Sequence, residues 1–350
     1  MITKLLQTLG IRHPIIQAPM GGGPGTPRLA AAVSNAGGLG SLAAAYLTPE
    51  ELLNELAETR KLTDGPLNVN LFAGGYHTRA DRDPAPMLAV MRGVHAELGL
   101  PAPSMPDVPP DPFPQQVEVV LRERPAVFSF TFGIPPADTM DALRDADIVT
   151  IGTATTLTEA EMLIEARVDA IVAQGAEAGA HRGTFAGSFE DSMVPTLELV
   201  RQIASRGDTP VIASGGLMTG ADIASALKAG AQAVQLGTAF LACPEAGTSA
   251  AYRQALAESV GDDTVITRVY SGRPARGIRN AFVELVGEEV VLPFPIQNSL
   301  TRPMRAAAAK AMKPGYLSLW AGTGVARMRS MPAADLVAML VREMGDVTPK

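Results

Sequence analysis

The sequence predicts an α/β protein, a (β/α)8 TIM barrel that carries a small C-terminal cap domain. Three observations predict this fold. Eight short apolar runs recur between residues 15 and 238, and most of them are followed by a helical pattern. The runs are almost continuously apolar, as strands are when helices cover their sheet. Several runs end in glycine-rich loops, which is typical of the carboxyl ends of barrel strands, where active sites form.

The predicted strands alternate with helices in chain order. They cover residues 15–20, 39–43, 67–72, 127–132, 148–153, 170–173, 211–214 and 233–238. Two helix starts have N-cap signals, Thr48 before Pro49 and Thr158 with Glu161. A doubly wound open sheet is the alternative fold, but the glycines at 21–23 lack the spacing of a dinucleotide-binding loop.

Two segments depart from this alternation. Residues 101–114 contain seven prolines and predict a rigid surface excursion. After the eighth unit, mixed short runs and helices at 246–260 and 301–312 predict a small cap, and a last amphipathic helix at 333–344 is expected to pack back on the barrel. The predicted domains are a barrel at 1–245, completed by a C-terminal helix at 330–350, and a cap over one barrel face at 246–315.

The composition excludes several classes of protein. The formal net charge is −7, whereas nucleic-acid-binding proteins carry clusters of basic residues, so the composition argues against nucleic-acid binding. No apolar run reaches the ~18 residues of a membrane span, and the first residues contain no signal-peptide core, so we expect a cytoplasmic protein. Cys243 is the only cysteine, which rules out an internal disulfide and a thiolate metal cluster. We therefore expect no metal site.

The loops after the seventh and eighth strands predict a phosphate site. Residues 214–220 and 235–238 combine glycines with hydroxyl side chains, so backbone N–H groups can approach a phosphate closely. Barrels often hold phosphate after these two strands. Ordinary glycine turns are the alternative interpretation for each loop alone.

Polar side chains follow two other strands, the third and the sixth. Asn70 and Gln174 are amides at strand ends, where they can hydrogen-bond a planar heterocycle or a neighbouring side chain. His181 lies in a glycine-rich loop after the sixth strand and is a candidate general base, because imidazole moves protons near neutral pH. Glu177 orients this histidine or caps the loop, and Arg182 is a candidate for steering an anion.

Three further histidines are expected to be structural or solvated. His13 precedes the first strand, at the barrel face opposite the active site. His77 and His95 fall in the irregular excursion, where we expect them to be solvated.

Taken together, these motifs resemble the nitronate monooxygenases, the family formerly called 2-nitropropane dioxygenases. The resemblance covers most of the chain, and its motifs are specific in combination. They are QAPMGG at 17–22, NVNLF at 68–72, SFTFG at 129–133, QGAEAGAHRG at 174–183, ASGGLMTG at 213–220, QLGT at 235–238 and GRPARG at 272–277, with residues 293–301 extending the match into the cap.

The resemblance implies an FMN-dependent enzyme that oxidises alkyl nitronates with O2 to carbonyl compounds and nitrite. His181 would remove the α-proton of a neutral nitroalkane and orient an anionic substrate. The flavin would carry the redox step. By matching positions, the residues implied to bind FMN are Ala18, Met20, Asn70, Gln174, Gly179, Gly215, Gly216, Gln235, Leu236, Gly237 and Thr238.

The chain departs from the family pattern at two positions. Ala180 stands where the family often has a second glycine, and we expect its methyl group to narrow the loop. Thr131 stands where many relatives have histidine, at a position that faces the substrate in the family. Ser299 lies in the cap segment that the family places near the substrate.

Two other functions remain open at this point. A flavin-dependent NAD(P)H reductase of the enoyl-thioester or quinone type would use the same glycine loops. A barrel that binds a phosphate ligand without redox chemistry would also need them. The sequence leaves the physiological nitro compound and the oligomeric state open.

Overall fold

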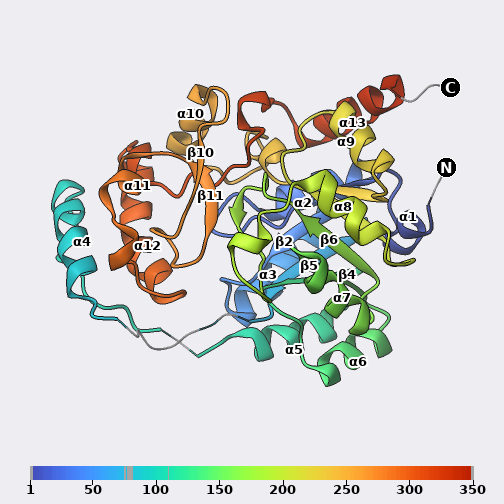
Figure 1. The fold of residues 1–350 in the computed structure, drawn as a ribbon, viewed down its shortest axis with the longest axis horizontal. Coiled ribbons are helices and arrows are strands. Elements are labelled where there is room, and N and C mark those ends of the chain that lie inside the picture. Colours follow the sequence, from blue (N-terminus) through green and yellow to red (C-terminus); the bar gives the residue numbers. More distant parts are fainter. Residues whose placement is uncertain (1–2, 75, 77–81, 109, 348–350) are drawn as a thin grey trace.

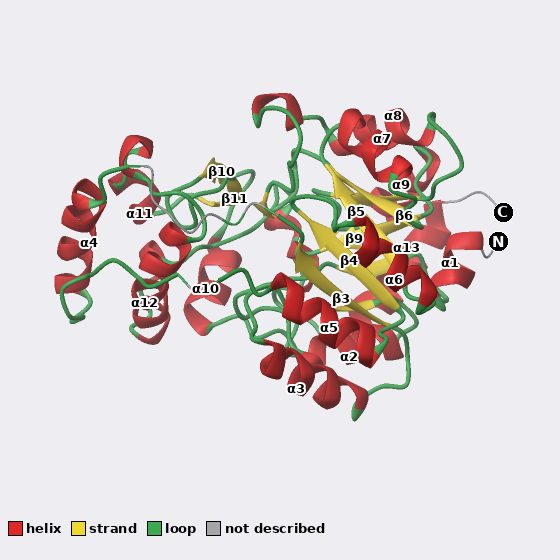
Figure 2. Cartoon of the chain, turned by 90° about the horizontal axis from the view of Figure 1, so that it is seen from below, coloured by secondary structure: helices red, strands yellow, loops and turns green. Residues whose placement is uncertain are grey.

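Eight parallel strands close into a barrel in the computed structural model, which describes residues 3–74, 76, 82–108 and 110–347 (Figures 1 and 2). The strand order is β1-β9-β8-β6-β5-β4-β3-β2, and a parallel bridge between Ile16 and Leu39 closes the ring. This confirms the predicted (β/α)8 class. The barrel strands are β1 (Ile15–Gln17), β2 (Gly40–Ala43), β3 (Leu67–Phe72), β4 (Val127–Thr131), β5 (Val149–Ala154), β6 (Ala170–Gln174), β8 (Val211–Ser214) and β9 (Ala233–Leu236).

Helices surround the barrel, and several begin at a side-chain cap. Thr48 is the N-cap of α3, as predicted, and Glu51 completes a capping box with it. The predicted cap at Thr158 is wrong, because α7 begins earlier and Thr156 accepts its capping hydrogen bond. The surrounding helices are α1 (Lys4–Leu9), α2 (Pro27–Asn35), α3 (Pro49–Arg60), α5 (Phe113–Glu123), α6 (Ala137–Asp145), α7 (Leu157–Glu165), α8 (Thr196–Ala204), α9 (Gly220–Lys228) and α13 (Ala333–Val347).

The C-terminal helix α13 packs back on the barrel. Leu336, Val337 and Leu340 are buried in the same cluster as the barrel core. The side chain of Glu343 accepts a 2.8 Å hydrogen bond from the backbone N–H of Gly220, at the start of α9. The last helix thus supports the loop that follows β8. Within the described residues, none of the helices combines the length and apolarity that a bilayer span requires.

The remaining elements form a second layer over the carboxyl ends of the barrel strands. A small antiparallel sheet joins this layer to the barrel, because β7 belongs to the loop after β6. Its strands are β7 (Ala180–His181), β10 (Thr264–Thr267) and β11 (Ala275–Ile278), and its helices are α4 (Ala85–Glu97), α10 (Ala250–Glu258), α11 (Ala281–Leu285) and α12 (Ile296–Lys310). Short 3-10 turns occur at Glu190–Ser192, Thr238–Phe240, Glu288–Val290, Pro314–Tyr316 and Val325–Arg327.

Helix α4 belongs to the cap layer, although its sequence lies between two barrel strands. Met87 and Met91 are fully buried in a cluster with Tyr270 and Phe282. Both views show α4 beside α11 and α12, away from the barrel (Figures 1 and 2). The domain division stays a prediction, and on this packing α4 would be assigned to the cap.

The histidines outside the glycine-rich loop have structural surroundings. The prediction that His95 is solvated is wrong: its side chain is 6% exposed, and its Nδ1 lies 2.6 Å from the Pro101 carbonyl. His13 lies just before β1, at the opposite end of the barrel from the loops that carry glycine. His77 lies outside the described residues.

Candidate active site

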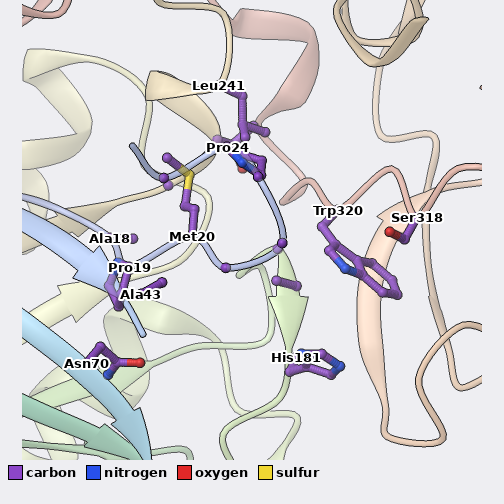
Figure 3. Close-up of a pocket in the computed structure, with 18 of the residues that line it drawn as sticks. Ala18, Pro19, Met20, Pro24, Ala43, Asn70, His181, Leu241, Ser318 and Trp320 are labelled. Carbon is purple, nitrogen blue, oxygen red and sulfur yellow. The ribbon is translucent and has the colours of Figure 1, made fainter. Parts of the chain in front are cut away.

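A cavity of about 730 Å³ opens at the carboxyl ends of the barrel strands, beneath the cap (Figure 3). Its volume is in the range of small-molecule and cofactor sites. Most of the predicted site residues line it. They are Ala18, Met20, Asn70, Thr131, Gln174, Gly179, His181, Gly215, Gly216, Gln235, Leu236, Gly237 and Thr238.

Ser299 is absent from this lining. It lies on α12, and the neighbouring residues of that helix that line the cavity are Asn298, Arg302 and Arg305. The helical repeat explains the difference: residues 298, 302 and 305 share one face of α12, and residue 299 points about a third of a turn away. The helix therefore presents two guanidinium groups to the cavity.

The loop after β8 forms a cradle that only glycine can build. Gly215 and Gly216 have φ values of +129° and +70°, a region that side chains strongly disfavour. A Cβ atom at Gly215 would lie 2.7 Å from Thr196 Oγ1, and one at Gly216 would lie 2.9 Å from Glu177 Cβ. The backbone N–H groups of Gly216 and Gly237 donate to no acceptor among the described residues. Such paired, unengaged donors suit the oxygens of a phosphate group.

The helix that follows this cradle supplies no free N-terminus. Asp222 Oδ2 accepts hydrogen bonds from the N–H groups of Met218 and Thr219, at 2.8 and 2.9 Å, and pairs with Arg327 at 2.8 Å. The first turn of α9 is therefore capped by the protein itself. A phosphate at this position would be held by the glycine loops.

The two predicted amides differ in their hydrogen bonds. Asn70 donates to Ser129 Oγ at 2.9 Å, and its side-chain oxygen points into the cavity (Figure 3). Both polar atoms of the Gln174 side chain form hydrogen bonds within the protein. Its Nε2 donates to the carbonyl of His181 at 3.1 Å, and its Oε1 accepts from the N–H of Gly183 at 2.8 Å. Asn70 thus offers an acceptor to a ligand, while Gln174 fixes the loop that carries the histidine.

His181 lies on β7 with its ring in the cavity, facing Trp320 (Figure 3). Its Nε2 lies 2.8 Å from Ser271 Oγ, which belongs to the cap. Aromatic rings surround the imidazole, with centroid distances of 5.7 Å to Trp320, 5.9 Å to Phe132 and 6.3 Å to Phe294. The ring therefore lies among aromatic side chains and forms one side-chain hydrogen bond, with Ser271.

This enclosure makes His181 a neutral imidazole. Burial, and then the positive charges of Arg273 and Arg305, lower its pKa to about 3. A neutral imidazole has one nitrogen with a free lone pair, which can accept a proton. The same two cations favour an anion beside the ring.

The two guanidinium groups near His181 are held by protein carbonyls and a ring. Arg273 lies 3.7 Å from the ring centroid of Phe132 and donates to the Thr184 carbonyl at 3.2 Å. Arg305 donates to Asn298 O and Oδ1, both at 2.8 Å, while its Nε is buried without a partner. No acidic side chain pairs with Arg305 within the described parts of the chain. A buried cation without a counter-ion is expected where a ligand supplies the negative charge.

The charged neighbours of His181 in sequence have structural roles. Glu177 accepts from Thr196 N and Oγ1, at 2.8 and 2.7 Å, and so caps α8; it does not orient the histidine. Arg182 is 1% exposed and donates to three carbonyls, those of Gly175, Gln174 and Ser192. The prediction that Arg182 steers an anion is therefore wrong.

The two departures from the family pattern have different consequences. Ala180 has a φ of +63°, in the left-handed region that glycine adopts freely. An alanine in this conformation costs about 1–2 kcal/mol of conformational free energy. The main effect of replacing glycine is therefore this backbone strain and not the volume of the added methyl group. Thr131 lines the cavity, and its hydroxyl lies 3.5 Å from that of Thr153. The polar group at position 131 thus faces the cavity as a small hydroxyl.

Comparison with known proteins places these observations in a family. The family model described as nitronate monooxygenase matches residues 3–343. A nitronate monooxygenase of Pseudomonas aeruginosa is 42% identical, and the alignment covers 98% of this chain and 99% of that protein. The crystal structure of a nitroalkane oxidase from Streptomyces ansochromogenes superposes with a TM-score of 0.90 at 39% identity, over 97% of this chain and 98% of that one. The structure of FabK from Thermotoga maritima superposes with a TM-score of 0.77 at 27% identity, over 98% and 96%.

Proposed function

Because the chain belongs to the nitronate monooxygenase family of flavin-dependent oxidoreductases, we propose that it oxidises alkyl nitronates with O2 to carbonyl compounds and nitrite. The observation that carries this proposal is a neutral histidine in a cavity that is also lined by the guanidinium groups of Arg302 and Arg305 and by a glycine cradle. The cations suit an anionic substrate, and the cradle suits a phosphate-bearing cofactor.

FMN is the proposed flavin. The loops of Gly215–Gly216 and Gly237–Thr238 would hold its phosphate, and Asn70 would accept a hydrogen bond from its ring system. The backbone near Ala18 and Met20 would lie against the ring. Bound FMN would supply the redox chemistry, taking electrons from the substrate and passing them to O2.

The substrate would bind between His181 and the arginines. A nitronate is a planar anion with two oxygens, a shape that guanidinium groups bind well. Arg305 would hold the negative charge, Arg273, which stacks on Phe132 outside the cavity lining, would add positive potential, and the aromatic rings would exclude water. With a neutral nitroalkane, His181 would first accept the α-proton, and the resulting anion would then be stabilised by the same cations.

The low pKa of His181 predicts the pH dependence for neutral nitroalkanes. His181 is already neutral above about pH 3, so its capacity to accept a proton does not change between about pH 5 and 7.5. We expect kcat/KM for a neutral nitroalkane to be flat over this range. Initial rates of nitrite release at several pH values test this. A rising limb centred near pH 6.5 would show that His181 titrates normally.

The direct test of the function is oxygen uptake by the purified flavin-loaded protein after addition of a preformed alkyl nitronate. We expect rapid uptake with nitrite release and no requirement for NADH. The parallel sample contains NADH without nitronate. No uptake with nitronate, together with rapid bleaching of the flavin by NADH, would contradict the proposal.

The same experiment tests the second candidate. The second candidate is a flavin-dependent reductase, and the structural likeness to FabK at 27% identity supports it. A reductase would be reduced rapidly by NADH or NADPH. The stronger likeness to the nitroalkane oxidase, with a TM-score of 0.90, favours the oxidase chemistry.

A further inference from the structure

We propose that Ser271 is a positioning residue for His181: its hydroxyl accepts the Nε2–H of the imidazole, which fixes the ring and leaves Nδ1 as the proton acceptor. The serine comes from the cap and the histidine from the barrel, 90 residues apart in sequence. This inference rests on the proposed role of His181 as the base.

The hydroxyl of Ser271 is itself held in place by its own turn. Ser271 is 1% exposed. Its Oγ lies 3.2 Å from the carbonyl oxygen of Arg273 and 3.3 Å from the backbone nitrogen of the same residue. A side chain with three polar contacts and almost no exposure has one defined rotamer, so it can define the orientation of the ring that it contacts.

Counting protons assigns the tautomer. The N–H of Arg273 donates to Ser271 Oγ, and the hydroxyl proton of Ser271 donates to the carbonyl of Arg273. The remaining lone pair of Oγ then accepts from Nε2–H of His181, so each of the three contacts contains one proton. If the hydroxyl donated to Nε2 instead, two oxygen atoms would face each other without a proton between them, and Nδ1 would carry a hydrogen and could not act as a base.

The backbone fixes the serine and the histidine relative to each other. Residues His181 and Ala275 are paired in the β7–β11 ladder, and the N–H of Arg182 donates to the carbonyl of Pro274 at 2.9 Å. Gly272 allows the intervening turn: its φ is +86°, and a Cβ there would lie 2.4 Å from the carbonyl oxygen of Leu292. The turn that brings Ser271 to the ring therefore requires glycine.

Among the described residues, the rings and cations around the imidazole are weak competitors of Ser271 as hydrogen-bond acceptors. The nearest rings, Phe132, Phe294 and Trp320, contain no hydrogen-bond acceptor of comparable strength. The nearby charged groups, Arg273 and Arg305, are donors. Among the residues that the structure describes, Ser271 supplies the side-chain hydrogen bond to this imidazole.

The tautomer can be measured by nitrogen-15 NMR of the imidazole rings in the flavin-loaded protein. The chain contains four histidines, and comparison with the His181→Asn variant assigns the signals of His181. We expect wild-type His181 to carry its proton on Nε2 alone. In Ser271→Ala we expect a mixture of both tautomers, and in Ser271→Thr, which keeps the hydroxyl, a return to one.

Kinetics provide the second readout. We expect Ser271→Ala to lower kcat/KM for a neutral nitroalkane by about 10- to 100-fold, because a misplaced base loses that order of rate. The value for a preformed nitronate should change less than about threefold, since that substrate needs no proton removal. Ser271→Thr should recover most of the nitroalkane rate.

Ser34→Ala is the matched control. Ser34 is also buried, donates to a backbone carbonyl at 2.8 Å and accepts from a backbone N–H at 3.1 Å, but it contacts no histidine. It should change thermal stability without changing the tautomer of His181. An unchanged single tautomer and an unchanged ratio of the two substrates in Ser271→Ala would overturn the proposal while leaving the base role of His181 intact. Undiminished nitroalkane turnover in His181→Asn would remove the base role, and the proposal with it.

Discussion

Replacing His181 by asparagine should lower kcat/KM for neutral nitroalkanes by about 10²- to 10⁴-fold, the usual contribution of a positioned general base. Asparagine keeps a polar side chain of similar width but cannot accept the proton. The flavin should stay bound, because the glycine cradle lies on other loops. Turnover of a preformed nitronate should fall much less, since its proton is already gone.

The measurement is nitrite release from a nitroalkane and from its nitronate, with the flavin absorbance recorded for each sample. His13→Asn is the matched control, because His13 lies before β1 at the opposite end of the barrel. Equal losses for both substrates would mean that the histidine binds the anion and is not a base. Full nitroalkane activity would show that another group removes the proton.

Replacing Arg305 by methionine should lower kcat/KM for nitronates by about 10- to 100-fold. Hydrogen bonds to charged groups contribute about 1.5–3 kcal/mol, and each ~1.4 kcal/mol corresponds to a factor of ten. The change also removes one of the two cations that lower the pKa of His181, so that pKa should rise toward its ordinary value. Burial, the largest cause of the low pKa, and the charge of Arg273 both remain, so the nitroalkane profile should stay flat between about pH 5 and 7.5.

This substitution should destabilise the fold only slightly. No carboxylate pairs with Arg305 among the described residues, so its loss leaves no buried anion without a partner. The loss of its two hydrogen bonds to the buried Asn298 should cost about 1–3 kcal/mol, so thermal unfolding should show a modestly lower Tm. Lys310→Met, on the exposed end of the same helix, is the control for removing a positive charge from α12. An unchanged kcat/KM for nitronates would exclude Arg305 from substrate recognition.

The sequence was sufficient to predict the barrel and the composition of its cavity. The apolar runs mark the strands because a parallel sheet buried on both faces needs apolar side chains throughout. The residues at the carboxyl ends of these strands then meet at one face by geometry alone, which is why Asn70, His181 and Gly216 line the same cavity. These are local patterns, and local patterns are readable from one sequence.

The partners of His181 could not be predicted in the same way. Ser271 lies 90 residues further along the chain, and no periodicity links the two positions. Arg305 lies on a helix whose orientation depends on how the cap packs, and α4 joins that cap from an unexpected place in the chain. The motifs at 272–277 and 293–301 were the available signal, but a motif gives residue types and not contacts.

Strand alternation offered one signal that was missed. Successive residues of a strand point to opposite faces, so a histidine that faces the cavity implies that the next residue faces away. Arg182 does so, and its guanidinium binds three backbone carbonyls. The sequence indicates a loop here, and only an extended backbone across 180–182 would have assigned Arg182, which directly follows β7, a structural role from this rule.

The small sheet shared by the barrel and the cap has a consequence for the evolution of this scaffold. Because β7 carries His181 and pairs with β11, the two layers cannot be exchanged independently. A chimaera that kept this barrel but received a foreign cap would retain β7, which carries the histidine. It would lose β11, the strand that pairs with β7 and fixes its position. Divergence of substrate preference in such proteins should therefore proceed by paired changes on both sides of the ladder, so that the cap is inherited together with the barrel and not as a removable module.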